Sequence, residues 1–211
     1  MNNYLTVQGV SQIEFTEKRS KFIATIKHCE TETEALKFIE QLRSKYWDAS
    51  HNCFAYATEK GKISRFSDDG EPHGTAGKPI LDVINGAALT DTAVVVTRYF
   101  GGILLGTGGL SRAYSKAARD AVAAAKICKM VPCIVLHTVC EYQDHRKFMD
   151  LLETSGANIE SSDFTDKVKV DYYIKEENFA AFAEKLREIF SGRLSAVERD
   201  KRIAAFDLKE E

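Results

Sequence analysis

Nine of the chain's thirteen glycines lie between Gly70 and Gly109, and this crowding strongly constrains how the chain can fold. Glycine has the most backbone freedom to lose on folding, so it is costly inside helices and strands. A cluster this dense predicts tight turns, positive φ angles, or backbone that packs closely against another part of the molecule. Acidic, hydroxyl, imidazole and guanidinium side chains stand among these glycines. We therefore expect the functional residues to lie in this stretch.

Length and composition predict a globular protein of one large or two small domains, because 44% of the 211 residues are hydrophobic. No apolar run reaches the roughly 18 residues of a membrane helix, and the first residues do not resemble a secretory signal. Five cysteines without C-x-x-C spacing argue against disulfides and structural zinc. The sequence thus predicts a cytoplasmic protein with no cofactor, no metal and no membrane contact, and it leaves the oligomeric state open.

Hydrophobic periodicity predicts an α/β first half. Thr31 and Glu34 form a capping box for a helix that runs to about Tyr46. The β-branched run at residues 93–97 predicts a central strand that is buried on both faces. Other predicted elements are strands at 20–29, 51–58 and 63–66, a short buried helix at 80–86, and a long helix at 109–129.

Pro132 marks the expected boundary between domains 1–131 and 132–211. Beyond it, strands at 134–142, 157–164, 168–174 and 194–206 alternate with helices at 144–155 and 176–190. This β-α-β-β-α-β order is that of a ferredoxin-like domain. Residues 1–130 carry 17 Lys and Arg against 14 Asp and Glu, whereas residues 131–211 carry 12 against 17. A polyanionic partner would therefore meet the first domain.

Residues 101–109 follow the buried strand and open the long helix, which is the geometry in which backbone N–H groups hold an anion. The phosphate-binding lysine of a P-loop is missing after Gly106, and Ser111 replaces the last glycine of a dinucleotide fingerprint. Three interpretations stay open for this segment: a purely structural loop, a site for a non-nucleotide anion or polar partner, or a nucleotide cradle.

Asp68, Asp69 and Glu71 place three carboxylates within five residues. They could hold a divalent metal or act as an acid/base pair, but Asp-Gly is also a standard turn pair. His51 is either a structural histidine or a neighbour of these acids. Arg98 ends the buried strand, so it either faces a cleft or pairs with a carboxylate such as Asp68 or Asp69.

A basic stripe follows on the long helix, where Arg112, Lys116, Arg119 and Lys126 lie near one line opposite the apolar face. Such a stripe is either a solvated helix face or a track for a phosphate backbone. Catalysis by cysteine is not favoured, because Cys53 has apolar or aromatic neighbours and Cys128 falls on the apolar face.

Several motifs occur in order and resemble the YigZ/Impact family over roughly residues 15–125. They are Phe15-x-Glu-Lys-Arg-Ser-Lys-Phe-Ile, Ala49-Ser-His-Asn-Cys-Phe-Ala, Arg65-x-Ser-Asp-Asp-Gly-Glu-Pro-x-Gly-Thr-Ala-Gly, and Val94-Val-Val-Thr-Arg-Tyr-Phe-Gly-Gly-Ile with Leu105-Gly-Thr-Gly-Gly-Leu. The acidic C-terminal part resembles the extra domain of the bacterial YigZ branch. His73 stands where serine is common in the family.

The resemblance implies an α+β protein of two domains. The first would have the ribosomal-protein S-five domain-two-like fold of elongation factor G domain IV, and the second the ferredoxin-like fold of its domain V. Eukaryotic Impact proteins regulate translation through a ribosome-associated activator of a stress kinase, and the family supplies no established catalytic residues. A function that is inferred from the fold alone rests on analogy.

The leading hypothesis is a non-enzymatic, translation-linked regulatory protein that contacts RNA, a ribosome or a protein partner. The alternative is a small-molecule or phosphoester enzyme that uses Asp68, Asp69 and Glu71, with or without a metal. The expected binding surface consists of polar and glycine residues, namely His51, Arg65, Ser67, Asp68, Asp69, Glu71, Thr75, Arg98, Gly101, Gly102, Thr107, Gly108, Arg112, Lys116 and Arg119.

Overall fold

The computed structural model describes residues 3–207, which form two compact units, residues 4–129 and residues 130–206. The two units are described separately. Among the described helices, none is long and apolar enough to cross a membrane.

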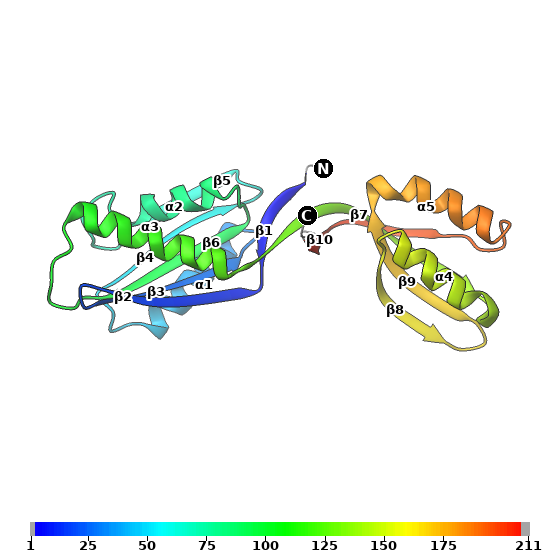
Figure 1. Cartoon of the computed structure of the whole chain (residues 1–211), viewed down its shortest axis with the longest axis horizontal. Coiled ribbons are helices and arrows are strands. Elements are labelled where there is room, and N and C mark those ends of the chain that lie inside the picture. Colours follow the sequence, from blue (N-terminus) through cyan, green and yellow to red (C-terminus); the bar gives the residue numbers. More distant parts are fainter. Residues whose placement is uncertain (1–2, 208–211) are drawn as a thin grey trace. The chain divides into compact units, whose positions relative to one another are not determined.

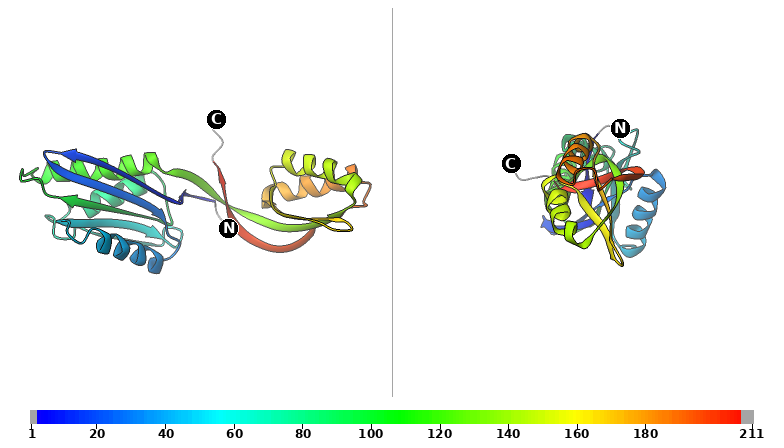
Figure 2. Two further views of the ribbon diagram at one scale, coloured as in Figure 1. Left: turned by 90° about the horizontal axis from the view of Figure 1, so that it is seen from below. Right: turned by 90° about the vertical axis from the view of Figure 1, so that its right-hand side faces the viewer.

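The N-terminal unit is a three-layer sandwich around one antiparallel sheet (Figures 1 and 2). The sheet order is β2-β3-β6-β4-β5. Helix α1 (Glu32–Lys45) packs on one face, and α2 (Gly77–Gly86) and α3 (Thr107–Ala124) pack on the other. The strands are β2 (Val10–Glu17), β3 (Ser20–His28), β4 (His51–Thr58), β5 (Ile63–Ser67) and β6 (Thr92–Tyr99).

Strand β6 shows why the sheet has helices on both faces. Val94 and Val96 join the core under α2 and α3, whereas Ala93 and Val95 join the core under α1. Because successive side chains of a strand point to opposite faces, a continuous apolar run needs a cover on each side. The predicted burial of this strand on both faces is confirmed. The predicted cap of α1 is confirmed too, since Glu34 N donates to Thr31 Oγ1.

The C-terminal unit has the predicted ferredoxin-like element order, and α4 and α5 cover one face of its sheet (Figure 1). The sheet runs β10-β7-β9-β8, and β1 (Tyr4–Gln8) also pairs with β7. Its core is aromatic, with Tyr172 edge-on to both Phe148 and Phe182. The elements are β7 (Lys126–Cys140), α4 (Tyr142–Thr154), β8 (Asn158–Phe164), β9 (Val168–Lys175), α5 (Glu176–Ile189) and β10 (Val197–Asp207).

The prediction that the long helix reaches residue 129 is wrong. Helix α3 ends at Ala124, the backbone at Ala125 is extended, and Lys126 and Cys128 belong to β7. Cys128 is buried in the strand, and its place on the apolar face of the predicted helix was a coincidence of spacing. Strand β7 therefore starts earlier than predicted, and Pro132 lies inside it. Strands β1 and β2 were not predicted, although β2 alternates between exposed and half-buried residues as an amphipathic strand does.

Candidate functional site beneath the glycine-rich segment

Asp68 organises the turn that joins β5 to α2. Its carboxylate accepts hydrogen bonds from the backbone N–H groups of Gly74, Ala76 and Gly77, at 2.8, 3.0 and 2.8 Å. Burial works against ionisation of this carboxyl, but the three backbone donors outweigh it and lower the pKa of Asp68 below its ordinary value. Asp68 thus accepts hydrogen bonds from backbone amides that have no partner within α2 at its start, and it holds the turn closed.

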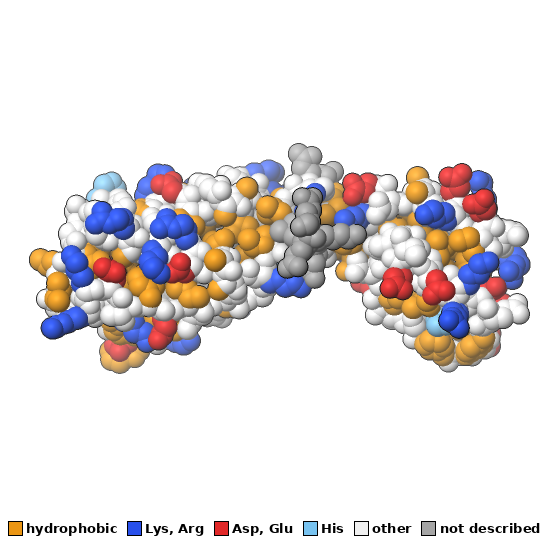
Figure 3. All heavy atoms as spheres, in the orientation of Figure 1, with side chains coloured by type: hydrophobic (Ala, Val, Ile, Leu, Met, Phe, Trp, Pro, Cys, Tyr) orange, Lys and Arg blue, Asp and Glu red, His pale blue; other side chains and the backbone are white. Residues whose placement is uncertain are grey.

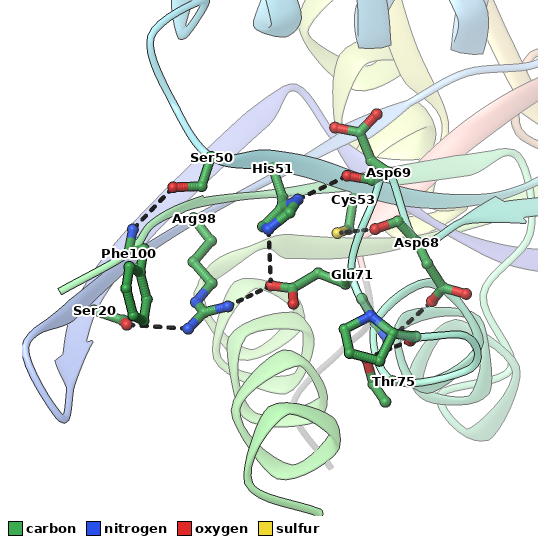
Figure 4. Close-up of polar contacts among 12 residues, drawn as sticks. Ser20, Ser50, His51, Cys53, Asp68, Asp69, Glu71, Thr75, Arg98 and Phe100 are labelled. Carbon is green, nitrogen blue, oxygen red and sulfur yellow. Dashed lines mark hydrogen bonds and ion pairs between the residues drawn. The ribbon is translucent and has the colours of Figure 1, made fainter. Parts of the chain in front are cut away.

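Asp69 and His51 tie the same turn to the start of β4. The Asp69 carboxylate accepts from Arg43 Nη2 at 3.0 Å and from Asn52 N at 2.6 Å. The His51 ring donates from Nδ1 to the Asp69 carbonyl oxygen at 2.8 Å, and its Nε2 lies 3.9 Å from Glu71 Oε1 (Figure 4). Both ring nitrogens of His51 therefore face oxygen atoms of the acidic turn.

A buried ion pair lies at the centre of the site (Figure 4). Arg98 Nη1 donates to Glu71 Oε1 at 2.6 Å, and both side chains are almost wholly buried. The hydroxyl of Tyr114 donates to the same carboxylate oxygen at 2.7 Å. Burial raises the pKa of Tyr114, with Cys53 and Glu71 adding to the shift, so the phenol stays protonated. Of the two alternatives that the sequence left open for Arg98, a cleft or an ion pair, the ion pair is formed, and its partner is Glu71 rather than Asp68 or Asp69.

Gly101 explains part of the glycine crowding, because another segment packs directly on its backbone. A Cβ built there would lie 2.0 Å from the carbonyl carbon and oxygen of Arg19, in the β2–β3 turn. Ser20 Oγ accepts from Gly101 N at 3.3 Å and from Arg98 Nη2 at 3.2 Å. The turn between β2 and β3 is therefore fixed against the glycine segment and against the buried arginine.

A pocket of about 530 Å³ opens beside this ion pair. Its lining brings together four predicted site residues and the apolar side chains that follow β6. The predicted residues are His51, Glu71, Arg98 and Thr107, and the apolar ones include Phe100, Leu104, Leu105 and Leu110. Ser67 and Thr75 belong to the acidic turn: Ser67 Oγ accepts from Asp69 N, and the Thr75 hydroxyl donates to the Pro72 carbonyl oxygen.

The remaining predicted residues lie elsewhere. Arg112 and Lys116 line a separate hollow of about 160 Å³ with Lys18 and Glu17. Arg119 lines a third, largely apolar groove between α2 and α3. Arg65 is exposed on β5 and donates to the Ser64 carbonyl oxygen. Gly102 has a positive φ in the loop before α3, and Gly108 is exposed in the first turn of α3. The residues of the expected binding surface therefore do not form one continuous surface, and they line three separate hollows or lie apart from them.

The three carboxylates of the acidic turn are all engaged by groups of the chain itself. Asp68 is held by backbone amides, Asp69 by Arg43 and Asn52, and Glu71 by Arg98 and Tyr114. Within residues 3–207 no three His, Cys, Asp or Glu side chains gather as metal ligands would. Cys53 is buried beside Asp68 and Tyr114, and burial raises the pKa of its thiol, so it remains protonated. The carboxylates of this turn and the thiol of Cys53 are thus held by hydrogen bonds and ion pairs within the N-terminal unit.

Sequence reasoning missed the residues that complete this network. Tyr114 and Ser20 are absent from the expected binding surface, and the sequence places them only within the long helix and the strand at 20–29. A tyrosine on a fully buried helix face is itself a signal, because its hydroxyl needs a hydrogen-bond partner. Arg43 and Lys18 carry no comparable signal, since exposed bases are common.

Comparison with known proteins places this architecture in a family. Residues 18–122 match the Impact N-terminal domain, and residues 138–193 match a domain of unknown function, DUF1949. The chain is 36% identical to the IMPACT family member YvyE of Bacillus subtilis, across 92% of this chain and 89% of that protein. It is 35% identical to the IMPACT family member YigZ of Escherichia coli, across 84% and 88%.

A solved structure described as a hypothetical protein is similar over both units. It is 32% identical in sequence, covers 95% of this chain and 98% of its own, and has a TM-score of 0.61. The element order, the glycine-rich motifs and these relatives agree with one another, and the chain belongs to the IMPACT family.

Proposed function

We propose that this protein is a translation-linked regulatory protein whose N-terminal unit binds RNA, free or within the ribosome. The observation that carries the proposal is the exposed basic surface at the start of α3. Lys18, Arg112 and Lys116 surround one hollow, and Glu17 is the acidic residue in its lining. Figure 3 shows Lys and Arg side chains over this helix, with acidic ones between them.

The chemistry of these side chains suits a phosphate backbone. Arg112, Lys116 and Arg119 are exposed on α3. The Lys116 ammonium lies 4.2 Å from the centre of the Phe15 ring and also pairs with Asp120 on the next turn. An exposed pair of this kind is weak, so a phosphate can replace Asp120 at little cost.

Fluorescence anisotropy with labelled single-stranded RNA across a salt series tests this proposal. Four phosphate contacts, from Lys18, Arg112, Lys116 and Arg119, give an expected log–log salt slope of roughly −3. The double reversal Arg112→Glu with Lys116→Glu should weaken binding strongly and flatten the slope. The matched control is Lys37→Glu with Lys45→Glu, which makes the same charge change on α1, on the opposite face of the sheet.

Co-sedimentation with ribosomes is the second measurement, and the α3 reversal should reduce the bound fraction more than the α1 reversal does. If RNA does not bind at about 50 mM salt, or if both reversals weaken it equally, the basic surface is not an RNA site. A protein partner then becomes the better explanation of the family's role.

A further inference from the structure

The pocket beside Arg98 is a site that RNA binding does not use. Its volume of about 530 Å³ is within the range of small-molecule sites, and it has a few polar groups in a mainly apolar lining. The basic residues assigned to RNA, Arg112 and Lys116, line a different hollow. The pocket therefore needs its own explanation.

Arg98 supplies the first observation that points to a ligand. Two of its nitrogens are occupied, by Glu71 and by Ser20. Its Nε is buried and has no hydrogen-bond acceptor among the described residues, although the side chain is only 6% exposed and lines the pocket. A buried N–H without an acceptor is costly and rare in folded proteins. Arg98 Nε is thus a buried donor for which the described residues supply no acceptor.

The start of α3 is an independent second observation. This helix of 18 residues begins at Thr107, which lines the same pocket. Its N-cap is Gly106, which has no side chain to cap the helix, and its first turn has no acidic residue. The first backbone N–H groups of a helix need acceptors, and the helix dipole favours a negative charge there. Arg98 Nε and the first N–H groups of α3 can therefore both donate hydrogen bonds to the acceptor atoms of one anionic ligand.

The surrounding groups limit the charge and shape of the ligand. Glu71 already accepts from both Arg98 and Tyr114, and its negative charge disfavours a doubly charged anion beside it. Phe100 is 48% exposed and Leu104 is 82% exposed, and both line the pocket. Large apolar side chains left in solvent beside a polar floor favour a ligand with an apolar body.

We propose that this pocket binds a small amphiphilic monocarboxylate. Its carboxylate receives hydrogen bonds from the first turn of α3 and from Arg98 Nε, and its apolar body lies against Phe100 and Leu104. The Phe100 ring lies over the guanidinium, with its centre 5.5 Å away, and stands next to Arg98 in Figure 4. Because Nε is buried, the Phe100 ring turns aside when the carboxylate binds.

The probe is sodium hexanoate, added to the full chain labelled with ¹⁵N. The Arg98 Nε–Hε signal and the Gly106 and Thr107 amide signals should shift together and saturate, with a Kd on the order of 1 mM. Acetate, which lacks the apolar body, and hexan-1-ol, which lacks the charge, should each bind about tenfold more weakly or worse. Inorganic phosphate should not compete with hexanoate.

Two isosteric variants test the carboxylate end without disturbing the buried ion pair. Thr107→Asp places a negative charge at the helix start, where it favours the helix but repels the ligand, and it should weaken hexanoate binding about tenfold or more. Thr107→Asn makes a change of the same size without charge and should retain binding. The Arg112→Glu/Lys116→Glu protein should still bind hexanoate, which separates this site from the RNA surface.

The proposal is overturned if hexanoate leaves the Arg98 and Thr107 signals in place, or if Thr107→Asp and Thr107→Asn bind it equally well. Equal shifts with hexan-1-ol would show that the pocket selects only for an apolar body, which also contradicts the proposal. Tighter binding of phosphate than of hexanoate would assign the site to a different anion.

Discussion

The two units are built alike from helices on an antiparallel sheet, yet they stabilise their centres differently. The N-terminal unit buries an ion pair, Arg98 with Glu71, whereas the centre of the C-terminal unit is a cluster of aromatic rings. The C-terminal unit has a comparable ion pair, in which Arg193 Nη1 lies 2.9 Å from Asp144 Oδ2. The arginine side chain of this pair is 56% exposed. Apolar packing alone can stabilise a domain of this size, so the buried charge pair is not needed for stability, and breaking it should cost far more than breaking an exposed pair.

The largest expected effect concerns whether the C-terminal unit folds when it is separated from the first unit. A fragment of residues 130–211 should unfold cooperatively on its own in a thermal scan followed by circular dichroism, because its aromatic core is formed within residues 134–194. The full chain is the control. A fragment that folds only when residues 1–129 are added would show that the C-terminal unit depends on the first.

Removing one charge from each ion pair should show the next largest difference. Glu71→Gln leaves Arg98 buried without a counter-ion and should lower the free energy of unfolding by about 3–5 kcal/mol. Asp144→Asn breaks the half-exposed pair and should cost about 1 kcal/mol or less. Urea unfolding of both variants measures this. Similar losses would mean that burial does not distinguish the two pairs.

Two glycines of the N-terminal unit should differ in their tolerance of a methyl group. Gly101→Ala forces a Cβ against the Arg19 backbone and should destabilise the unit by about 3 kcal/mol. Gly108→Ala meets only Arg112 Nη1 at 3.5 Å and should be neutral or stabilise by up to about 1 kcal/mol. Thermal unfolding distinguishes them, and an unaffected Gly101→Ala protein would contradict the close packing.

As the pH falls, the fold should lose more stability through Asp68 than through Asp171, although the pKa of each carboxyl is lowered. The pKa of Asp68 in the folded state lies below its unfolded value of about 3.9, so its ionised form stabilises the fold above that pH. This contribution is lost as the pH falls toward the folded-state pKa. Asp171, whose pKa is lowered mainly by a hydrogen bond from His137, is 45% exposed and should contribute less.

The measurement is urea unfolding from neutral pH down to about pH 3. Asp68→Asn should lower stability by about 2 kcal/mol at neutral pH and flatten the acid limb of the profile. Asp171→Asn is the matched variant, and an identical flattening in both proteins would argue against a special role for the acidic turn.

The smallest effect is expected on the exposed face of α3. The Arg112→Glu/Lys116→Glu protein should unfold within about 0.5 kcal/mol of the parent, since exposed charges contribute little to folding. A larger loss would show that these residues support the fold and would remove the basis for using them as RNA-binding probes.

The sequence alone determined most of the secondary structure and where the unusual chemistry lies. Periodicity and capping signals are local, so the strand at β6, the cap at Thr31 and the ferredoxin-like order were readable without tertiary information. The glycine crowding was readable for the same reason. The end of α3 was not, because Lys126 and Cys128 fit a helical spacing as well as a strand, and pairing with β1 lies far away in the sequence.

Only the tertiary structure decided which polar residues meet. Glu71 lies three residues from Asp68 and two from Asp69, but the turn directs it alone to Arg98 and Tyr114. No local pattern distinguishes three carboxylates that close a turn from three that bind a metal, because both use the same residue types at similar spacing. Which acid faces which donor depends on β4, β6 and α3 packing together, and these contacts join residues up to 43 positions apart.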